Sequence, residues 1–303
     1  MIPDFSLCRF RAADGAPHLG LISGGKVYDL TATGVDNYAS MEAWLKSASG
    51  RVAEAMADLI ALPKSVEALC DVDALMGEGG PTSLAPLDTQ EVWACGVTYE
   101  MSRKARMRES EEPTIYGRVY DAPRPEIFFK ATPERVVAPG EAVGIRADST
   151  WDVPEPEMAL VVTPGLEIVG YTVGNDMSSR SIEGENPLYL PQAKVYDRCC
   201  SLGPVVRLAK GFDPKDQAVK CVIYREGDVV FEGETHTSQI HRPLTELVDY
   251  LGRCNSLPRG AFVLTGTGIV PPDTFTLADG DVVEITFEGL GTLTNPVIEL
   301  PIN

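Results

Sequence analysis

Alternating apolar and polar positions open the chain and predict β-structure there. Apolar residues recur at every second position over residues 5–10 and 19–30, a spacing that turns one face of each strand toward a core. Ser23-Gly24-Gly25 interrupts the second run with turn residues. A run of helix formers follows at residues 53–62 and ends at Pro63. The amino-terminal part is therefore predicted to be a small α/β unit.

Strand-like apolar runs dominate the rest of the chain. They cover residues 92–99, 126–131, 157–162, 167–175, 199–208, 219–224, 229–235, 261–270 and 281–287. A helical pattern covers residues 243–251, with leucine or valine at i, i+3, i+4 and i+7. Regular βαβ alternation is missing, which disfavours a doubly wound parallel sheet. The predicted fold class is α+β and β-rich.

A segment rich in Gly, Pro and Ser at residues 76–88 indicates a linker. With 303 residues, the chain is longer than a typical single domain. We therefore expect an amino-terminal domain at residues 1–85 and a larger domain at residues 86–303.

Composition narrows the classes of partner. The net charge of −18 argues against nucleic acid, although a local cation in one cleft would still admit a small anionic substrate. Seven cysteines without C-x-x-C spacing are typical of reduced thiols in a cytoplasm. The chain shows no secretion signal and no apolar run near 18 residues in length, so neither secretion nor membrane insertion is expected.

Two carboxylates, Glu155 and Glu157, precede the apolar run Met158-Ala-Leu-Val-Val162. In an extended chain both side chains point to the same side. Like charges held this close raise each other's proton affinity unless a cation neutralises them. A solvated strand face decorated with carboxylates is the alternative, and it is the commoner situation for such a pair alone.

A third carboxylate joins this pair if the next strand folds back as a hairpin. With a turn centred on Pro164 and Gly165, residue 174 would lie opposite Glu155 and Asp176 opposite residue 153. Asp176 would then share the face of the pair. An all-oxygen triad favours Mg²⁺, with Mn²⁺ or Ca²⁺ as alternatives, over zinc.

Three further segments allow both a functional and a structural interpretation. Lys194 is either a solvated lysine or, beside a metal, a general base. The glycines of Thr265-Gly-Thr-Gly268 form either a backbone nest for a carboxylate, with Thr267 adding its hydroxyl, or a plain tight turn. The basic run from Arg103 to Arg108, followed by Glu109, Glu111 and Glu112, is best interpreted as a solvated helix with opposite charges.

Together these segments resemble the fumarylacetoacetate hydrolase superfamily. Its signature is Glu-x-Glu, a strand pair and a third carboxylate in a motif matched here by Gly174-Asn-Asp-Met-Ser-Ser-Arg180. The other matching segments are Gly96-Val-Thr-Tyr99, Pro125-Glu-Ile-Phe-Phe-Lys130, Lys194 and Thr265-Gly-Thr-Gly268. The resemblance implies a mixed β-roll catalytic domain with a smaller α/β amino-terminal domain, and a homodimer or homotetramer. It also implies a Mg²⁺ ion held by Glu155, Glu157 and Asp176, and a 2-oxo acid substrate.

Two features indicate which branch of the superfamily the chain resembles. Hydrolases and decarboxylases commonly carry a His shortly after the position of Thr98-Tyr99, and Ser102 stands there instead. The stretch from Ser181 to Lys194 resembles the sugar-acid dehydratase branch. This implies metal-dependent dehydration of 2-keto-3-deoxy-D-arabinonate or xylonate to 2,5-dioxopentanoate in pentose catabolism. The implied catalytic residues are Glu126 and Lys194, and the candidates for holding substrate are Thr98, Tyr99, Lys130, Arg180 and Thr267.

Two other functions stay open at this point. One is an acylpyruvate hydrolase or oxaloacetate decarboxylase on the same scaffold, against which Ser102 argues. The other is a non-catalytic metal-binding protein that kept the fold, which retention of Glu126 and Lys194 beside the three carboxylates disfavours.

Overall fold

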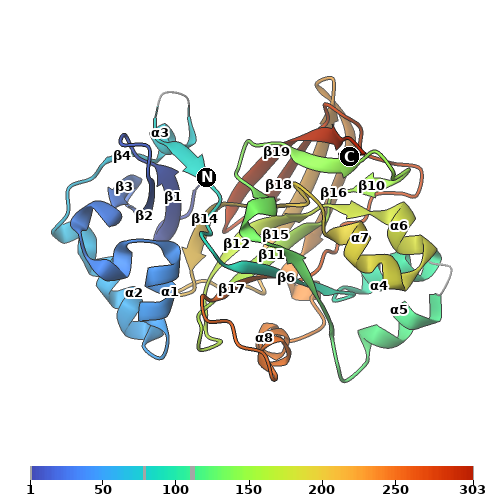
Figure 1. Ribbon diagram of the computed structural model, residues 1–303, viewed down its shortest axis with the longest axis horizontal. Helices are drawn as coiled ribbons and strands as arrows, with labels where there is room; N and C mark the ends of the chain where they lie inside the picture. The colour runs from blue at the N-terminus through green and yellow to red at the C-terminus, as the bar shows by residue number, and fades with distance from the viewer. Residues whose placement is uncertain (1, 78–79, 110–112, 303) are drawn as a thin grey trace.

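The fold is strand-rich and mixed α/β, which confirms the expected class (Figure 1). The computed structural model describes residues 2–77, 80–109 and 113–302. Their strands form one sheet of twelve, one of five and one of two. Within this part of the chain no helix is long and apolar enough to cross a lipid bilayer.

The amino-terminal lobe is a strand meander covered by helices. Its strands are β1 (Ser6–Arg11), β2 (Pro17–Ser23), β3 (Lys26–Asp29), β4 (Cys70–Asp71) and β5 (Thr82–Leu84). Its helices are α1 (Met41–Ala48), α2 (Val52–Ala61) and α3 (Val72–Met76). The turn expected between β2 and β3 is confirmed, with Gly24 and Gly25 at positive φ. Helix α1 was not predicted; the Ser40 hydroxyl caps it by accepting a hydrogen bond from the Ala43 amide.

The larger lobe carries the remaining elements. Its strands are β6 (Glu91–Gly96), β7 (Glu126–Ala131), β8 (Val136–Val137), β9 (Val143–Arg146), β10 (Asp152–Val153), β11 (Pro156–Val162), β12 (Ile168–Asp176), β13 (Ser178–Ser179), β14 (Cys200–Leu208), β15 (Ala218–Arg225), β16 (Asp228–His236), β17 (Ala261–Leu264), β18 (Val282–Phe287) and β19 (Gly291–Leu300). Its helices are α4 (Glu100–Glu109), α5 (Pro113–Tyr120), α6 (Arg180–Glu185), α7 (Leu190–Lys194) and α8 (Leu244–Gly252). In Figure 1, helices α4 to α7 gather at one end of this lobe, away from α1 and α2.

The largest sheet runs through both lobes. Its main strand order is β4-β3-β2-β1-β14-β12-β11-β17-β6-β7, and β1 pairs with β14 across the lobes. The division at residues 85 and 86 therefore stays a proposal about two lobes that share one sheet. The linker expected at residues 76–88 includes residues 78–79, which lie outside the described residues. Most pairings are antiparallel, as expected for a fold that is not doubly wound.

The β11–β12 hairpin brings the three carboxylates together, in a register two residues away from the predicted one. Gly174 lies opposite Glu157, and Glu155 and Asp176 exchange both backbone hydrogen bonds, at 3.1 and 3.0 Å. The prediction failed because the turn is wider than two residues, with Leu166 at positive φ, and a bulge follows Val161. A two-residue error preserves the side of the sheet, so the shared face is confirmed.

The hairpin sits at the centre of the core. Every residue of β11 is buried, and β11 pairs with β12 on one side and β17 on the other. Such full burial explains the continuous apolar run of its sequence.

Shortening a side chain in β11 will test this central position. Leu160 is fully buried, so Leu160→Ala should lower the free energy of unfolding by roughly 2–5 kcal/mol, because a cavity remains. Leu188 is 83% exposed, so Leu188→Ala should change it by less than about 0.5 kcal/mol. Chemical denaturation measures both, and equal losses would contradict the assignment of the core.

Candidate active site

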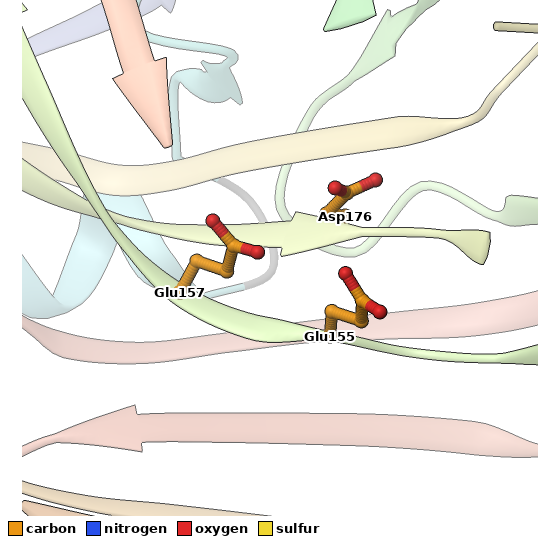
Figure 2. A group of neighbouring side chains, drawn as sticks. All are labelled: Glu155, Glu157 and Asp176. Carbon is orange, nitrogen blue, oxygen red and sulfur yellow. The ribbon is translucent and has the colours of Figure 1, made fainter. Parts of the chain in front are cut away.

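Three buried carboxylates form the centre of the site. Glu155 directly precedes β11, Glu157 is the second residue of β11 and Asp176 ends β12, and Figure 2 shows the three side chains converging. Their nearest oxygens all lie within 4.8 Å of one another, and each residue is at most 4% exposed. Three carboxylate oxygens at this spacing suit a hard divalent cation such as Mg²⁺. The sequence-predicted triad is thus brought together.

Two lysines offset part of the negative charge. Lys130 Nζ lies 2.5 Å from Asp176 Oδ1, and Lys194 Nζ lies 3.0 Å from Asp176 Oδ2. Burial alone would raise the pKa of Asp176, but the two ammonium groups outweigh it and lower that pKa. Glu157 has a raised pKa because it is buried and faces Asp176 and Glu155. Its Oε2 accepts a hydrogen bond of 2.6 Å from the Gly266 amide.

Lys194 reaches the centre from the end of α7. Its Nζ donates hydrogen bonds to Glu155 Oε2 at 2.6 Å, to Asp176 Oδ2 and to Ser178 Oγ at 2.6 Å. Burial opposes its charge, but the carboxylates of Asp176, Glu155 and Glu183 raise the pKa above its usual value. Within the chain itself this lysine is therefore an ammonium, and only further positive charge at the triad would ease loss of its proton.

Glu126 occupies a space that a glycine leaves open. It begins β7 opposite Gly96 of β6, where an added Cβ would lie 2.1 Å from Glu126 Oε2. Burial and the neighbouring carboxylate of Glu183 raise the pKa of Glu126 to about 7. A carboxyl group with this pKa holds its proton for about half of the time at neutral pH, as a general acid requires.

The groups described above enclose a small cavity of about 20 Å³. The residues lining it are Cys95, Gly96, Val97, Ser102, Arg106, Glu126, Phe128, Glu155, Glu157, Asp176, Glu183, Lys194, Gly266 and Thr267. No histidine is among them within the described residues. Ser102, which stands where the resemblance implied a His in hydrolases, donates a hydrogen bond to the Tyr99 carbonyl.

Of the five residues predicted to hold substrate, Thr267 lines the cavity and the other four are buried around it. Thr98 Oγ1 donates to the Thr265 carbonyl at 2.6 Å, and Tyr99 packs against Gly268. Beyond its contact with Asp176, Lys130 donates to two backbone carbonyls, at 2.8 and 2.6 Å. Arg180 lies 3.1 Å from Glu155 Oε1.

Helix α4 contributes charged residues that the sequence analysis assigned to solvent. Arg106 lies 2.6 Å from Glu155 and 2.7 Å from Glu183, and Glu109 lies 2.8 Å from Arg180. The side chains of Arg106 and Glu109 are only 11% and 4% exposed, so the prediction of a solvated helix was wrong for these two. It holds for Lys104 and Arg108, which are 63% and 55% exposed. Glu111 and Glu112, which the prediction also included, lie outside the described residues.

The face of α4 that turns inward carried a weak signal in the sequence. Ser102 and Ala105 are small residues that share the side of Arg106 and Glu109 at helical spacing, and both are buried. The surrounding charges hid this signal. Glu183 is another cavity-lining residue that was not predicted, although it lies within the stretch that resembles the dehydratase branch.

Comparison with known proteins identifies the family. The family model described as fumarylacetoacetate (FAA) hydrolase C-terminal matches residues 92–298, which is more than half of the chain. The protein belongs to this family. The matched residues of this fumarylacetoacetate hydrolase family member include the triad, Glu126 and Lys194.

Individual relatives within the family are also similar. A probable 2-keto-3-deoxyxylonate dehydratase from Haloferax volcanii is 57% identical over 213 residues, or 70% of this chain and 73% of that one. The 2-dehydro-3-deoxy-D-arabinonate dehydratase from Saccharolobus solfataricus is 48% identical over 220 residues, with the same coverage. A solved structure of 2-keto-3-deoxy-D-arabinonate dehydratase complexed with magnesium and 2,5-dioxopentanoate aligns with a TM-score of 0.79 and 35% identity, covering 98% of this chain and 100% of that one.

Metal binding should depend on Glu157 and on pH. We expect Glu157→Gln to weaken Mn²⁺ binding by about 100-fold or more, because one ligand loses its charge. The raised pKa of Glu157 means that protons compete with the metal at a higher pH than for an ordinary glutamate, so affinity should fall as pH is lowered. Electron paramagnetic resonance of Mn²⁺ measures both, with the exposed Glu91→Gln as control. An affinity unchanged between acidic and neutral pH would contradict this.

Proposed function

We propose that this protein removes water from a 2-keto-3-deoxy pentonate, the arabinonate or xylonate, and yields 2,5-dioxopentanoate in a metal-dependent reaction. The observation that carries the proposal is the cavity itself, in which Lys194 and Glu126 adjoin the oxygen triad. The names of the similar proteins from two organisms support the same chemistry.

Glu155, Glu157 and Asp176 would hold the Mg²⁺ ion. Their buried, closely spaced oxygens fit such an ion. The pKa of Glu157 is raised by burial and by the charges of Asp176 and Glu155, and a cation would offset those charges. When bound, the ion supplies positive charge to the carboxylate and ketone of a 2-oxo acid and so acidifies C3.

Lys194 is the proposed base at C3. Its Nζ lies in the cavity wall, between Glu155 and Asp176. Two of the carboxylates that raise the pKa of Lys194, Asp176 and Glu155, would also bind the ion, so offsetting their charge lowers that pKa. Ser178 Oγ keeps the Nζ in place through its hydrogen bond of 2.6 Å.

Glu126 is the proposed acid that protonates the departing C4 hydroxyl. Its pKa of about 7 leaves a proton available at neutral pH. Thr267 and the backbone around Gly266 are the proposed contacts for substrate oxygens, since both line the cavity. We propose that four other residues mainly position the groups that line the cavity and contact substrate less directly, because they are buried around it. These residues are Thr98, Tyr99, Lys130 and Arg180.

We also infer a homodimer or homotetramer in the cytoplasm. The family resemblance supports the assembly, and seven free cysteines, five of them buried, support a reducing compartment. Light scattering of the purified protein tests the first inference.

The direct test of the function mixes protein, Mg²⁺ and 2-keto-3-deoxy-D-arabinonate. We expect 2,5-dioxopentanoate by NMR, loss of activity with a chelator, and little turnover of an acylpyruvate or oxaloacetate in parallel assays. Turnover of those two compounds without dehydration would favour the hydrolase or decarboxylase instead.

Removing the acid should change the pH profile as well as the rate. We expect Glu126→Gln to lower kcat by about 10²–10⁴-fold, with Mn²⁺ affinity retained, because a proton donor is lost and no ligand is touched. In the unmodified protein kcat should fall as pH rises above about 7, where Glu126 loses its proton, and the variant should lack this limb. Steady-state kinetics from pH 5 to 9 measure both, with Glu91→Gln as control. An unaltered profile in Glu126→Gln would assign the acid elsewhere.

A further inference from the structure

The proposed dehydration leaves one proton transfer without a residue. Loss of the C3 proton and the C4 hydroxyl gives 5-hydroxy-2-oxopent-3-enoate, which is an isomer of 2,5-dioxopentanoate. To reach that product one proton must leave C5 and another must leave its hydroxyl oxygen, while C3 and C4 each gain one. Lys194 and Glu126 account for C3 and for the leaving hydroxyl, so a base near the far end of the substrate is still required.

The described residues that line the cavity offer few ionisable groups for this step. Outside the triad, Lys194 and Glu126, they are Cys95, Arg106 and Glu183. Burial raises the pKa of Cys95 far above neutrality, so its thiol is not a base. A guanidinium such as that of Arg106 keeps its proton in proteins. Glu183 is the remaining candidate.

Glu183 is built into the site as an available carboxylate. It lies on α6, is 3% exposed and lines the cavity. Arg106 Nη1 lies 2.7 Å from its Oε2. Within the described part of the chain Oε2 has no other hydrogen-bond donor, so this ion pair holds Glu183 at the cavity wall.

The position of Glu183 suits the far end of a substrate whose 2-oxo acid end is held at the triad. Arg106 bridges the two places, because its Nη2 contacts Glu155 at 2.6 Å while its Nη1 contacts Glu183. The guanidinium of Arg106 therefore connects Glu183 to the triad. Glu183 and Glu126 line the same small cavity, so the two carboxyl groups are neighbours, and the charge of Glu183 contributes to the raised pKa of Glu126.

We propose that Glu183 is the base that removes the C5 proton and converts the enone into 2,5-dioxopentanoate. This rests on the proposed function. As the C5–H bond breaks, its electron pair forms the C4–C5 double bond, the C3–C4 pair moves to C2–C3, and the charge collects on the C2 oxygen. Protonation at C3, by the proton that Lys194 took earlier, restores the ketone and leaves an enol at C5.

The remaining proton transfers restore both carboxyl groups. Glu183 returns its proton to C4 while the enol oxygen loses its own, which completes the aldehyde. That last proton passes to Glu183 and then to Glu126, which had given its proton to the departing hydroxyl. The proximity of the two carboxyl groups allows this return, and the sum over the cycle is the loss of one water molecule.

Glu183→Gln tests the proposal, with Glu185→Gln as a matched control, because Glu185 is an exposed glutamate on the same helix. Each protein is incubated with Mg²⁺ and 2-keto-3-deoxy-D-arabinonate in D₂O. We expect Glu183→Gln to form dioxopentanoate about 100-fold or more slowly. It should still exchange the C3 proton and lose the C4 hydroxyl, so the conjugated enone accumulates and is seen by ultraviolet absorbance and NMR. Glu185→Gln should match the unmodified protein.

The outcomes separate this inference from the function on which it rests. Dioxopentanoate formed at the normal rate by Glu183→Gln, or C3 exchange lost together with product, would overturn the role of Glu183 and leave the dehydratase in place. No product from the unmodified protein would overturn both. A slowed reaction with accumulated enone and normal C3 exchange supports the role, because a merely structural defect would slow all steps together.

Discussion

The burial of three like charges on one hairpin is the constraint on which the rest of the site depends. Glu155, Glu157 and Asp176 lie within a core where β11 has no exposed residue. Buried carboxylates this close are stable only with compensating charge. Lys130 and Lys194 supply part of it, at 2.5 and 3.0 Å from Asp176. The site is therefore suited to a cation, and the carboxylates of Glu155 and Asp176 also hold Lys194 beside the triad.

The helical end of the larger lobe adds a second layer of charge over this centre. Helices α4 and α6 bring in Arg106, Glu109, Arg180 and Glu183, which alternate in sign. Arg106 and Arg180 both contact Glu155, so the layer is connected to the triad. The cavity therefore combines the triad with Arg106 and Glu183 from this layer and with Glu126.

Several parts of the site were predictable because they follow from local geometry. The period of two along a strand placed Glu155 and Glu157 on one face, and the turn residues before β12 predicted a hairpin. Asp176 was therefore predicted to share that face, despite a register error of two residues. Other parts failed for physical reasons. Charge patterning placed Arg106 and Glu109 in solvent, since a charged helix face is usually solvated and only partners distant in sequence make its burial favourable. Strand β19, with Asn295 and Pro296 inside it, lacked the usual pattern.

The sequence by itself determined the β-rich class, the carboxylates of the triad and the family resemblance, because strand periodicity, turn residues and short motifs act between near neighbours in the chain. Only the tertiary structure decided what those residues meet. Glu126 occupies the space beside Gly96, and Lys130 forms an ion pair with Asp176. Arg106 of α4 contacts both Glu155 and Glu183. These contacts link segments far apart along the chain, and their energy depends on burial and on the sum of charges, which no local pattern records.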